Sequence, residues 1–158
     1  PAVSLLNAAL IERTNGDFLF YEEGVTTSVG RLMKAVDNER IEIGAKLGVE
    51  VIPDPVLGVE QGYQAEPTYD TGYSQAPGFK GIMAQSQLDN RYFNEDAGYG
   101  LVFLTDLAEH IGVGTPTMDA VLKIVSVIMD RDYKAEKART MESLNLSKYS
   151  LDELKQLL

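Results

Sequence analysis

The stretch "SVGRLMKAVDNERIEIGAKL", residues 28–47, contains the clearest helical pattern in the chain and decides the expected fold class. Glu42 and Lys46 stand in the favourable i,i+4 order on its polar side. Gly48 follows as a stop signal. The apolar side chains recur at spacings of three and four, as on one face of a helix, at Val29, Leu32, Met33, Val36, Ile43 and Leu47. We therefore predict a long amphipathic helix.

Further helices are expected on both sides of this one. Thr115 and Pro116 are typical of a cap and a first turn, and the broad apolar face from 121 to 129 predicts an almost fully buried helix. Ser150 and Glu153 form a capping-box pattern before a final helix. Another helix is expected from about 101 to 111. An N-terminal helix should place four residues on one apolar face: Leu5, Leu6, Ala9 and Leu10.

Strand signals are weak, because Pro53 and Pro55 interrupt the apolar piece "VEVIPDPV". The chain is therefore predicted to be all-α. The stretch 58–81 differs from the rest, being rich in Gly, Pro, Tyr, Gln and Ser without an apolar period. It is either a substrate-facing segment or a surface excursion. Its aromatic residues would pack it down or line a ligand site: Tyr63, Tyr69, Tyr73 and Phe79.

Composition restricts the partners. The 158 residues suit one domain, and 14 basic against 24 acidic residues give a net charge of -10, which disfavours nucleic acid and anionic membranes. No apolar run approaches the roughly 20 residues that span a bilayer. The absence of cysteine excludes disulfides and thiolate metal sites. Together these features predict a cytoplasmic protein without nucleic-acid or membrane partners.

The beginning of the sequence is unusual. It opens at Pro1, without Met, directly into the apolar-periodic segment "AVSLLNAALIE". We interpret this as a piece of a longer chain, because proteins rarely start inside a buried helix. The alternative is a processed terminus with Pro1 at the first helical position, where proline is favoured.

Several kinds of site are not indicated. No GxGxxG or GxxxxGK[ST] pattern occurs, and "GVGTP" (112–116) is better explained as a helix stop followed by a cap. One histidine and no cysteine give no zinc-ligand spacing, and no GxSxG elbow supports a Ser-His-Asp triad. His110 is expected at a helix C-terminus, in a structural or solvent role and not in catalysis.

The stretch "RYFNEDAGYG", residues 91–100, is the remaining candidate site. Arg91 and Glu95 would form an exposed i,i+4 pair of small energetic value. Arg91 and Asp96 are five residues apart, which on a helix separates them by about 140°. They can serve one ligand only if the helix ends or bends between them, and the glycines after Ala97 suggest an end. Local reasoning alone favours a surface ion pair over an active site.

Five pieces in order resemble the C-terminal substrate domain of the octopine/nopaline (opine) dehydrogenase family. They are "LLNAALIE" (5–12), "FYEEGVTTSVGRLMKAVDNERIEIGAKLG" (20–48), "RYFNEDAGYGLV" (91–102), "GVGTPTMDAVL" (112–122) and "RTMESLNL" (139–146). The resemblance implies an all-α, multi-helix domain like the C-terminal domains of opine and 6-phosphogluconate-type dehydrogenases. It implies residues 1–158 are a substrate-binding and dimerisation domain that works with an N-terminal Rossmann domain absent from this chain.

The resemblance also implies the chemistry. Opine dehydrogenases reductively condense a 2-oxo acid such as pyruvate with the amino group of an amino acid or amine, using NADH or NADPH. The matching positions make Arg91 the anchor for the oxo-acid carboxylate, and Asp96 the partner of a catalytic histidine. A guanidinium suits the first role because it binds carboxylate through two parallel hydrogen bonds. A carboxylate suits the second because it fixes the tautomer of the imidazole.

One departure limits these expectations. The family's catalytic histidine comes immediately before the proline that matches Pro1, so it lies outside this sequence, and His110 should not inherit its role. We expect these residues to be inactive alone. Two alternatives remain: a related keto- or hydroxy-acid dehydrogenase resembling ketopantoate reductase, and a non-catalytic helical interaction domain. The amino-acid substrate and the choice between NADH and NADPH stay open.

Overall fold

The computed structural model describes residues 1–158 and is helical, with one isolated antiparallel bridge between Leu19 and Met83 in place of any sheet. The all-α prediction is confirmed. None of the helices combines the length and the apolar character that a membrane span needs. The chain divides into two compact units: residues 1–37 with 52–90, and residues 38–51 with 91–158.

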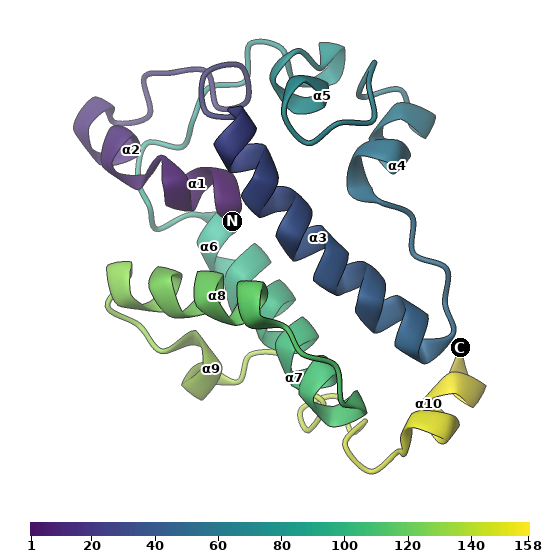
Figure 1. The fold of residues 1–158 in the computed structure, drawn as a ribbon. Coiled ribbons are helices and arrows are strands. Elements are labelled where there is room, and N and C mark those ends of the chain that lie inside the picture. The colour runs from purple at the N-terminus through teal and green to yellow at the C-terminus, as the bar shows by residue number, and fades with distance from the viewer. The chain divides into compact units, whose positions relative to one another are not determined.

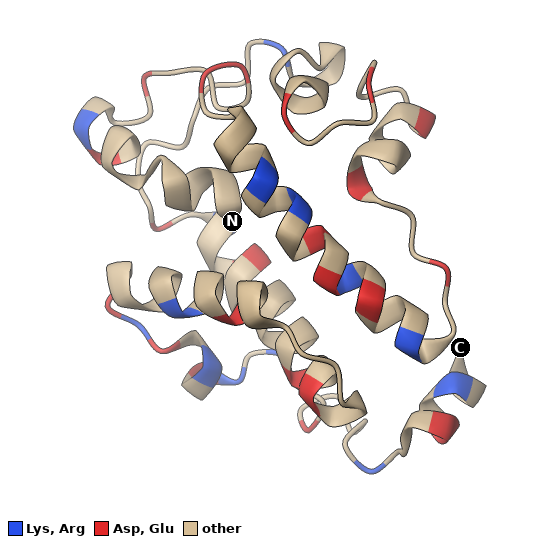
Figure 2. Ribbon diagram, viewed as in Figure 1, with Lys and Arg blue, Asp and Glu red and all other residues tan.

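Helix α3, Thr27–Leu47, is the longest element at 21 residues and belongs in part to each unit (Figure 1). It begins one residue before the predicted start, and Gly48 follows it with a φ of +80°. That left-handed conformation carries little cost for glycine, so the predicted stop is confirmed. Figure 2 shows basic and acidic residues interspersed along the helix, as expected for its polar side.

The first unit also contains α1 (Ala2–Leu6), α2 (Ala8–Thr14), α4 (Asp54–Glu60), α5 (Thr71–Ser74) and the 3-10 turn η1 (Pro77–Phe79). Pro1 precedes the first helical residue instead of occupying it. The segment "VEVIPDPV" enters α4, with Pro55 in the first turn, where its missing N–H costs nothing.

The predicted N-terminal apolar face is wrong. The helix breaks at Asn7, whose side-chain amide donates to the carbonyls of Val3 and Gly24, at 2.9 Å each. The break changes which residues face inward, so Leu6 and Leu10 are exposed. The buried apolar residues of this segment are instead Ala2, Val3 and Ile11.

The aromatic side chains of the stretch 58–81 pack it against the rest of its unit. This is one of the two arrangements predicted for them, the other being the lining of a ligand site. The ring of Phe79 stacks on Tyr21, with centroids 4.4 Å apart, and also lies parallel to Tyr73 and Tyr63. The Tyr69 hydroxyl donates to Asp37 on α3, at 2.5 Å, and the Tyr73 hydroxyl donates to Asp54 on α4. Burial and the nearby Asp54 carboxylate raise the pKa of Tyr73, so it remains a neutral donor.

The second unit is built around η2, a π-helical segment over Asp96–Leu101. It is preceded by α6 (Arg91–Asn94) and followed by α7 (Val102–Ile111), α8 (Pro116–Ile128), α9 (Tyr133–Glu136) and α10 (Leu151–Leu157). Helices α6, α7, α8 and α9 all pack against η2, and α7 and α8 also contact each other (Figure 1).

The prediction that the helix after Pro116 is almost fully buried is wrong. Met118, Val121, Leu122 and Val125 form its buried face. Ile124, Val127 and Ile128 are 49%, 65% and 40% exposed. Only one side of α8 packs on the rest of its unit, so its other apolar residues remain at the surface.

The start of α8 is capped from a distant part of the sequence. Thr115 stands at the predicted N-cap, but its hydroxyl donates to Asp119, at 3.2 Å, instead of accepting a backbone bond. The buried Glu39 carboxylate accepts from the N–H groups of Thr117 and Met118, at 2.7 and 2.8 Å. Glu39 therefore satisfies two of the amides that a helix leaves unpaired at its start.

The predicted capping box and the predicted position of His110 at a helix C-terminus are confirmed. Ser150 and Glu153 form the capping box of α10. His110 lies in the last turn of α7, and its Nε2 lies 2.7 Å from the Tyr149 carbonyl. Because a carbonyl only accepts, the imidazole must donate there, which ties α7 to the segment before α10.

Candidate functional site

Helix α6 is one turn long and is anchored by Phe93, which is 0% exposed. Arg91 is the first residue of this turn and forms an ion pair with Glu95, at 3.7 Å between Nη2 and Oε2. The side chains are 66% and 62% exposed, so this pair contributes only a few tenths of a kcal/mol, about 0.3–0.5. Glu95 thus has the predicted surface role, and it holds Arg91 weakly.

The predicted break in helix geometry between Arg91 and Asp96 is present. Helix α6 ends at Asn94, and the π-helical segment η2 begins at Asp96. The Glu95 carbonyl accepts from Gly100 N–H, an i→i+5 bond of 2.9 Å, and from Tyr99 N–H at 3.0 Å. The glycines do not end the helix, as the sequence suggested, but accompany a wider turn. Such π segments are rare in proteins, and many of those that are known lie at functional sites.

Asp96 is half-buried at the first position of η2. Burial raises the pKa of its carboxyl group, and the neighbouring Glu95 acts in the same direction. Arg91 opposes this effect, since its positive charge lowers the pKa of Asp96. The two predicted site residues therefore interact electrostatically, although the ion pair of Arg91 is with Glu95.

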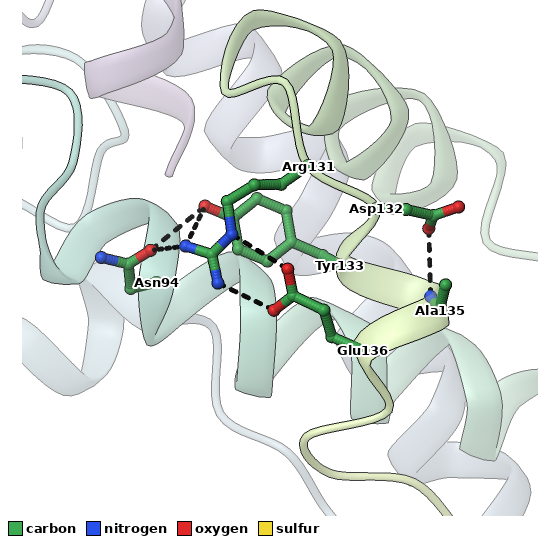
Figure 3. Close-up of polar contacts among 6 residues, drawn as sticks. All are labelled: Asn94, Arg131, Asp132, Tyr133, Ala135 and Glu136. Carbon is green, nitrogen blue, oxygen red and sulfur yellow. Dashed lines mark hydrogen bonds and ion pairs between the residues drawn. The ribbon is translucent and has the colours of Figure 1, made fainter.

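A cluster around Arg131 holds the last residue of α6 (Figure 3). Arg131 donates through Nη1 to the Asn94 side-chain oxygen, at 2.6 Å. Its Nε and Nη2 donate to the two carboxylate oxygens of Glu136, at 2.9 and 2.8 Å. This two-point geometry is the strong form of an arginine–carboxylate pair. The bonds to Arg131 lower the pKa of Glu136.

Tyr133 extends this cluster to η2. Its hydroxyl donates to the Asn94 oxygen, at 3.2 Å, and its ring lies 4.5 Å from the guanidinium carbon of Arg131. The ring also lies against Gly98: a Cβ at this position would lie 2.9 Å from a ring carbon of Tyr133. The ring is buried, with 1% exposed. We call Asn94, Gly98, Arg131, Tyr133 and Glu136 the Arg131 clamp.

Sequence reasoning missed the clamp. Asn94 and Gly98 lie inside "RYFNEDAGYG", but their partners come from positions 131–136, more than 30 residues later. The one local signal was Asp132, which caps α9 by accepting from Ala135 N–H at 3.0 Å and thereby orients this segment.

The surface of the second unit has clefts of different sizes. One of about 830 Å³ follows α8 and the segment after it, and its lining includes Asp119, Lys123, Val127, Arg131 and Lys134. Another, about 310 Å³, lies beside His110, and a third, about 100 Å³, is lined in part by Thr105. None of these three is lined by Arg91 or Asp96. No cluster of three or more His, Cys, Asp or Glu residues could hold a metal ion.

The sequence identifies the class of domain to which this chain belongs. Residues 1–129 match the family model described as the NAD/NADP octopine/nopaline dehydrogenase, alpha-helical domain. The chain belongs to this family of oxidoreductases, whose members are in general NAD(P)-dependent. The segment 131–136 lies beyond the matched residues.

Individual relatives agree with this assignment. The chain is 39% identical to an opine dehydrogenase from Arthrobacter sp. (strain 1C) over 148 residues, which are 93% of this chain and 40% of that protein. It is 30% identical to Protein ocs from Agrobacterium tumefaciens (strain Ach5), and 29% identical to vitopine synthase from Allorhizobium ampelinum. Each of these alignments spans 128 residues, 80% of this chain and 35% of the relative. The chain thus spans well under half the length of these relatives.

Proposed function

We propose that these residues are the substrate domain of an NAD(P)H-dependent opine dehydrogenase. The enzyme would condense a 2-oxo acid, such as pyruvate, with the amino group of an amino acid and reduce the product. Family membership supports the class of reaction. The observation that carries the proposal within this chain is the helix break that separates Arg91 from Asp96.

Arg91 is proposed to bind the carboxylate of the oxo acid. Its guanidinium is exposed, and its ion pair with Glu95 is long enough for a substrate carboxylate to replace. A two-point bond to that carboxylate would orient the oxo carbon, so that hydride reaches one face of it. Arg131 is unsuited to this role, because its guanidinium already makes two short bonds to Glu136.

Asp96 is proposed to orient a catalytic histidine upstream of Pro1. The carboxylate would accept from one ring nitrogen, fixing the tautomer and stabilising the imidazolium while the other nitrogen takes and returns protons. The partial burial of Asp96 supports this role, since a half-buried carboxylate makes a stronger hydrogen bond than one in water.

The dinucleotide would supply the hydride and is proposed to bind mainly to a Rossmann domain outside these 158 residues. This chain carries no glycine-rich phosphate loop that would hold it. A second copy of the enzyme is the further proposed partner. Its proposed contact is α8, where Ile124, Val127 and Ile128 are exposed.

The decisive experiment is an assay of NAD(P)H oxidation by the full-length enzyme with pyruvate, with and without a panel of amino acids. We expect oxidation to require the amino acid. Oxidation with the oxo acid alone would instead support a keto-acid reductase resembling ketopantoate reductase. The absence of oxidation with every pair would support a non-catalytic interaction domain.

A further inference from the structure

The segment 131–136 contacts the polypeptide on both sides of Asp96. It holds Asn94, the last residue of α6, and it covers Gly98, the third residue of η2. We infer that Arg131 and Tyr133 are positioning residues that hold the junction between α6 and η2, and through it the relative orientation of Arg91 and Asp96. This inference rests on the proposed roles of those two residues.

The contact on the α6 side is polar and specific. The Asn94 side-chain oxygen accepts from Arg131, at 2.6 Å, and from Tyr133, at 3.2 Å. Arg131 is itself held by both oxygens of Glu136, so its guanidinium plane has a defined direction. Figure 3 shows the guanidinium between Asn94 and Glu136. Asn94 lies three residues after Arg91, so this contact holds the same short turn that carries the proposed anchor.

The contact on the η2 side is one of packing. The ring of Tyr133 lies so close to Gly98 that a Cβ there would be 2.9 Å from a ring carbon. Gly98 is two residues after Asp96, and the ring is buried. A rigid aromatic ring thus fixes the backbone of η2 immediately after the proposed histidine partner.

The junction needs such support where it begins, because its first carbonyl accepts in both the α and the π pattern. The Glu95 carbonyl accepts both from Tyr99, in the α pattern, and from Gly100, in the π pattern, at nearly equal distances. No side chain caps the start of η2. A shift to the α pattern would change the register by one residue, or about 100° around the helix axis. That rotation would turn η2 relative to α6, and it would change the orientation of Asp96 relative to Arg91.

The test uses Arg131→Met and Tyr133→Phe in the full-length enzyme. Arg131→Met removes the guanidinium and keeps an unbranched side chain, and we expect kcat/KM for the oxo acid to fall roughly 10- to 100-fold. Tyr133→Phe removes only the hydroxyl and should have a smaller effect in the same direction. The KM for the dinucleotide should stay unchanged in both. Lys134→Gln is the control, because it breaks the 2.6 Å pair with Asp119 in the same segment without touching Asn94.

A double-mutant comparison separates positioning from general weakening of the fold. If Arg131 acts through Arg91, the Arg131→Met change should cost little further kcat/KM in an Arg91→Ala background. A merely structural role would give the same factor in both backgrounds, and that result would overturn the inference.

Hydrogen exchange gives a readout that does not depend on turnover. Arg131→Met should speed exchange of the amides of residues 95–100, while those of α10 keep their rates. Unchanged exchange at 95–100 would overturn the inference, as would wild-type kinetics for Arg131→Met in an active enzyme. A wild-type enzyme that lacks amine-dependent turnover would overturn the proposed function, and the functional part of this inference with it.

Discussion

Two arginines near the α6–η2 junction differ in how firmly their guanidinium groups are held. Arg131 is fixed by two short bonds to Glu136 and one to Asn94. Arg91 has a single long, exposed ion pair with Glu95. A weakly held guanidinium, like that of Arg91, suits a group that must exchange its partner for a substrate. A firmly held guanidinium, like that of Arg131, suits a group that must keep the backbone in place.

Arg91→Ala in the full-length enzyme should raise the KM for the oxo acid roughly 100-fold. The reason is the loss of a charged two-point hydrogen bond worth about 3 kcal/mol. Arg91→Lys should recover only part of this, because an ammonium cannot make the paired bonds. Glu95→Gln is the matched control and should leave the KM unchanged or lower it, since it releases Arg91. An unchanged KM in Arg91→Ala would remove the anchor assignment.

Asp96→Asn should lower kcat by about 10²- to 10⁴-fold, the range that general acid–base catalysis contributes. The oxo-acid KM should change little, because Asp96 is proposed to contact the histidine and not the substrate. Steady-state kinetics across pH would measure both the kcat and the oxo-acid KM of the variant. Turnover at the wild-type rate would contradict the proposed pairing.

The same substitution should stabilise the fold at neutral pH. Because burial raises the pKa of Asp96, the folded protein binds more protons than the unfolded chain as pH passes between the two pKa values. The free energy of unfolding therefore falls as pH rises through this window. Asp96→Asn should show a higher Tm than wild type at pH 7, and the difference should disappear below the ordinary value of 3.8.

Glu136→Gln is a control that should change the Tm in the opposite direction. Its hydrogen bond to Arg131 lowers the pKa of Glu136, so the stability that this carboxylate contributes is lost as pH falls through that lowered pKa. The variant should have a lower Tm than wild type at pH 7, with the gap closing in acid. Thermal melts over pH 3–8 would measure both substitutions. A lower Tm for Asp96→Asn at pH 7 would contradict the assigned effect of burial.

At the scale of elements, the packing of η2 against Tyr133 leaves no room for a side chain at Gly98. Gly98→Ala would place a Cβ 2.9 Å from the ring, and overpacking of this kind costs about 1–3 kcal/mol. Gly100→Ala is a matched control in the same segment, because its Cβ would meet nothing closer than 3.7 Å. That change should be neutral or stabilise the fold by about 0.5 kcal/mol. Denaturant unfolding would measure both, and equal effects would contradict the packing argument.

The start of α8 depends on hydrogen bonds to Glu39, which lies on α3. Glu39→Ala would leave two backbone N–H groups without their acceptor, and we expect a loss of about 2 kcal/mol. Glu42→Ala, at an exposed position of the same helix, should cost only about 0.3 kcal/mol. Urea unfolding would compare the two. A cost for Glu39→Ala no larger than that for Glu42→Ala would show that water replaces the carboxylate.

At the scale of the whole molecule, the exposed apolar residues of α8 lead to a prediction about assembly. We expect the full-length enzyme to be a dimer, and Val127→Glu to make it monomeric, because a charge would have to be buried at the contact. Leu10→Glu is the control, since Leu10 is exposed on α2, outside the proposed contact. Light scattering after size-exclusion chromatography would measure the mass. A dimeric Val127→Glu enzyme would contradict this contact.

Helices with a local signal were predictable. The 3.6-residue period predicted α3 and its end at Gly48, and the Ser150–Glu153 pattern predicted α10. The period failed at the N-terminus, where a single side chain, Asn7, breaks the helix and redirects its apolar face. It also overestimated the burial of α8, because apolar residues show what a helix can bury but not how many neighbours surround it.

The sequence by itself therefore determined the helical class and the family. The helical class follows from side-chain patterns within one or two turns of the chain, and the family follows from stretches shared with relatives. The spacing of Arg91 and Asp96 predicted a break between them only on the condition that both serve one ligand. Only the tertiary structure revealed that the break is a π-helical segment, that Glu39 caps α8, and that Arg131 and Tyr133 hold both sides of Asp96. Those features depend on partners 30 to 80 residues apart, and no local pattern specifies which distant side chain will meet an unpaired backbone group or a glycine.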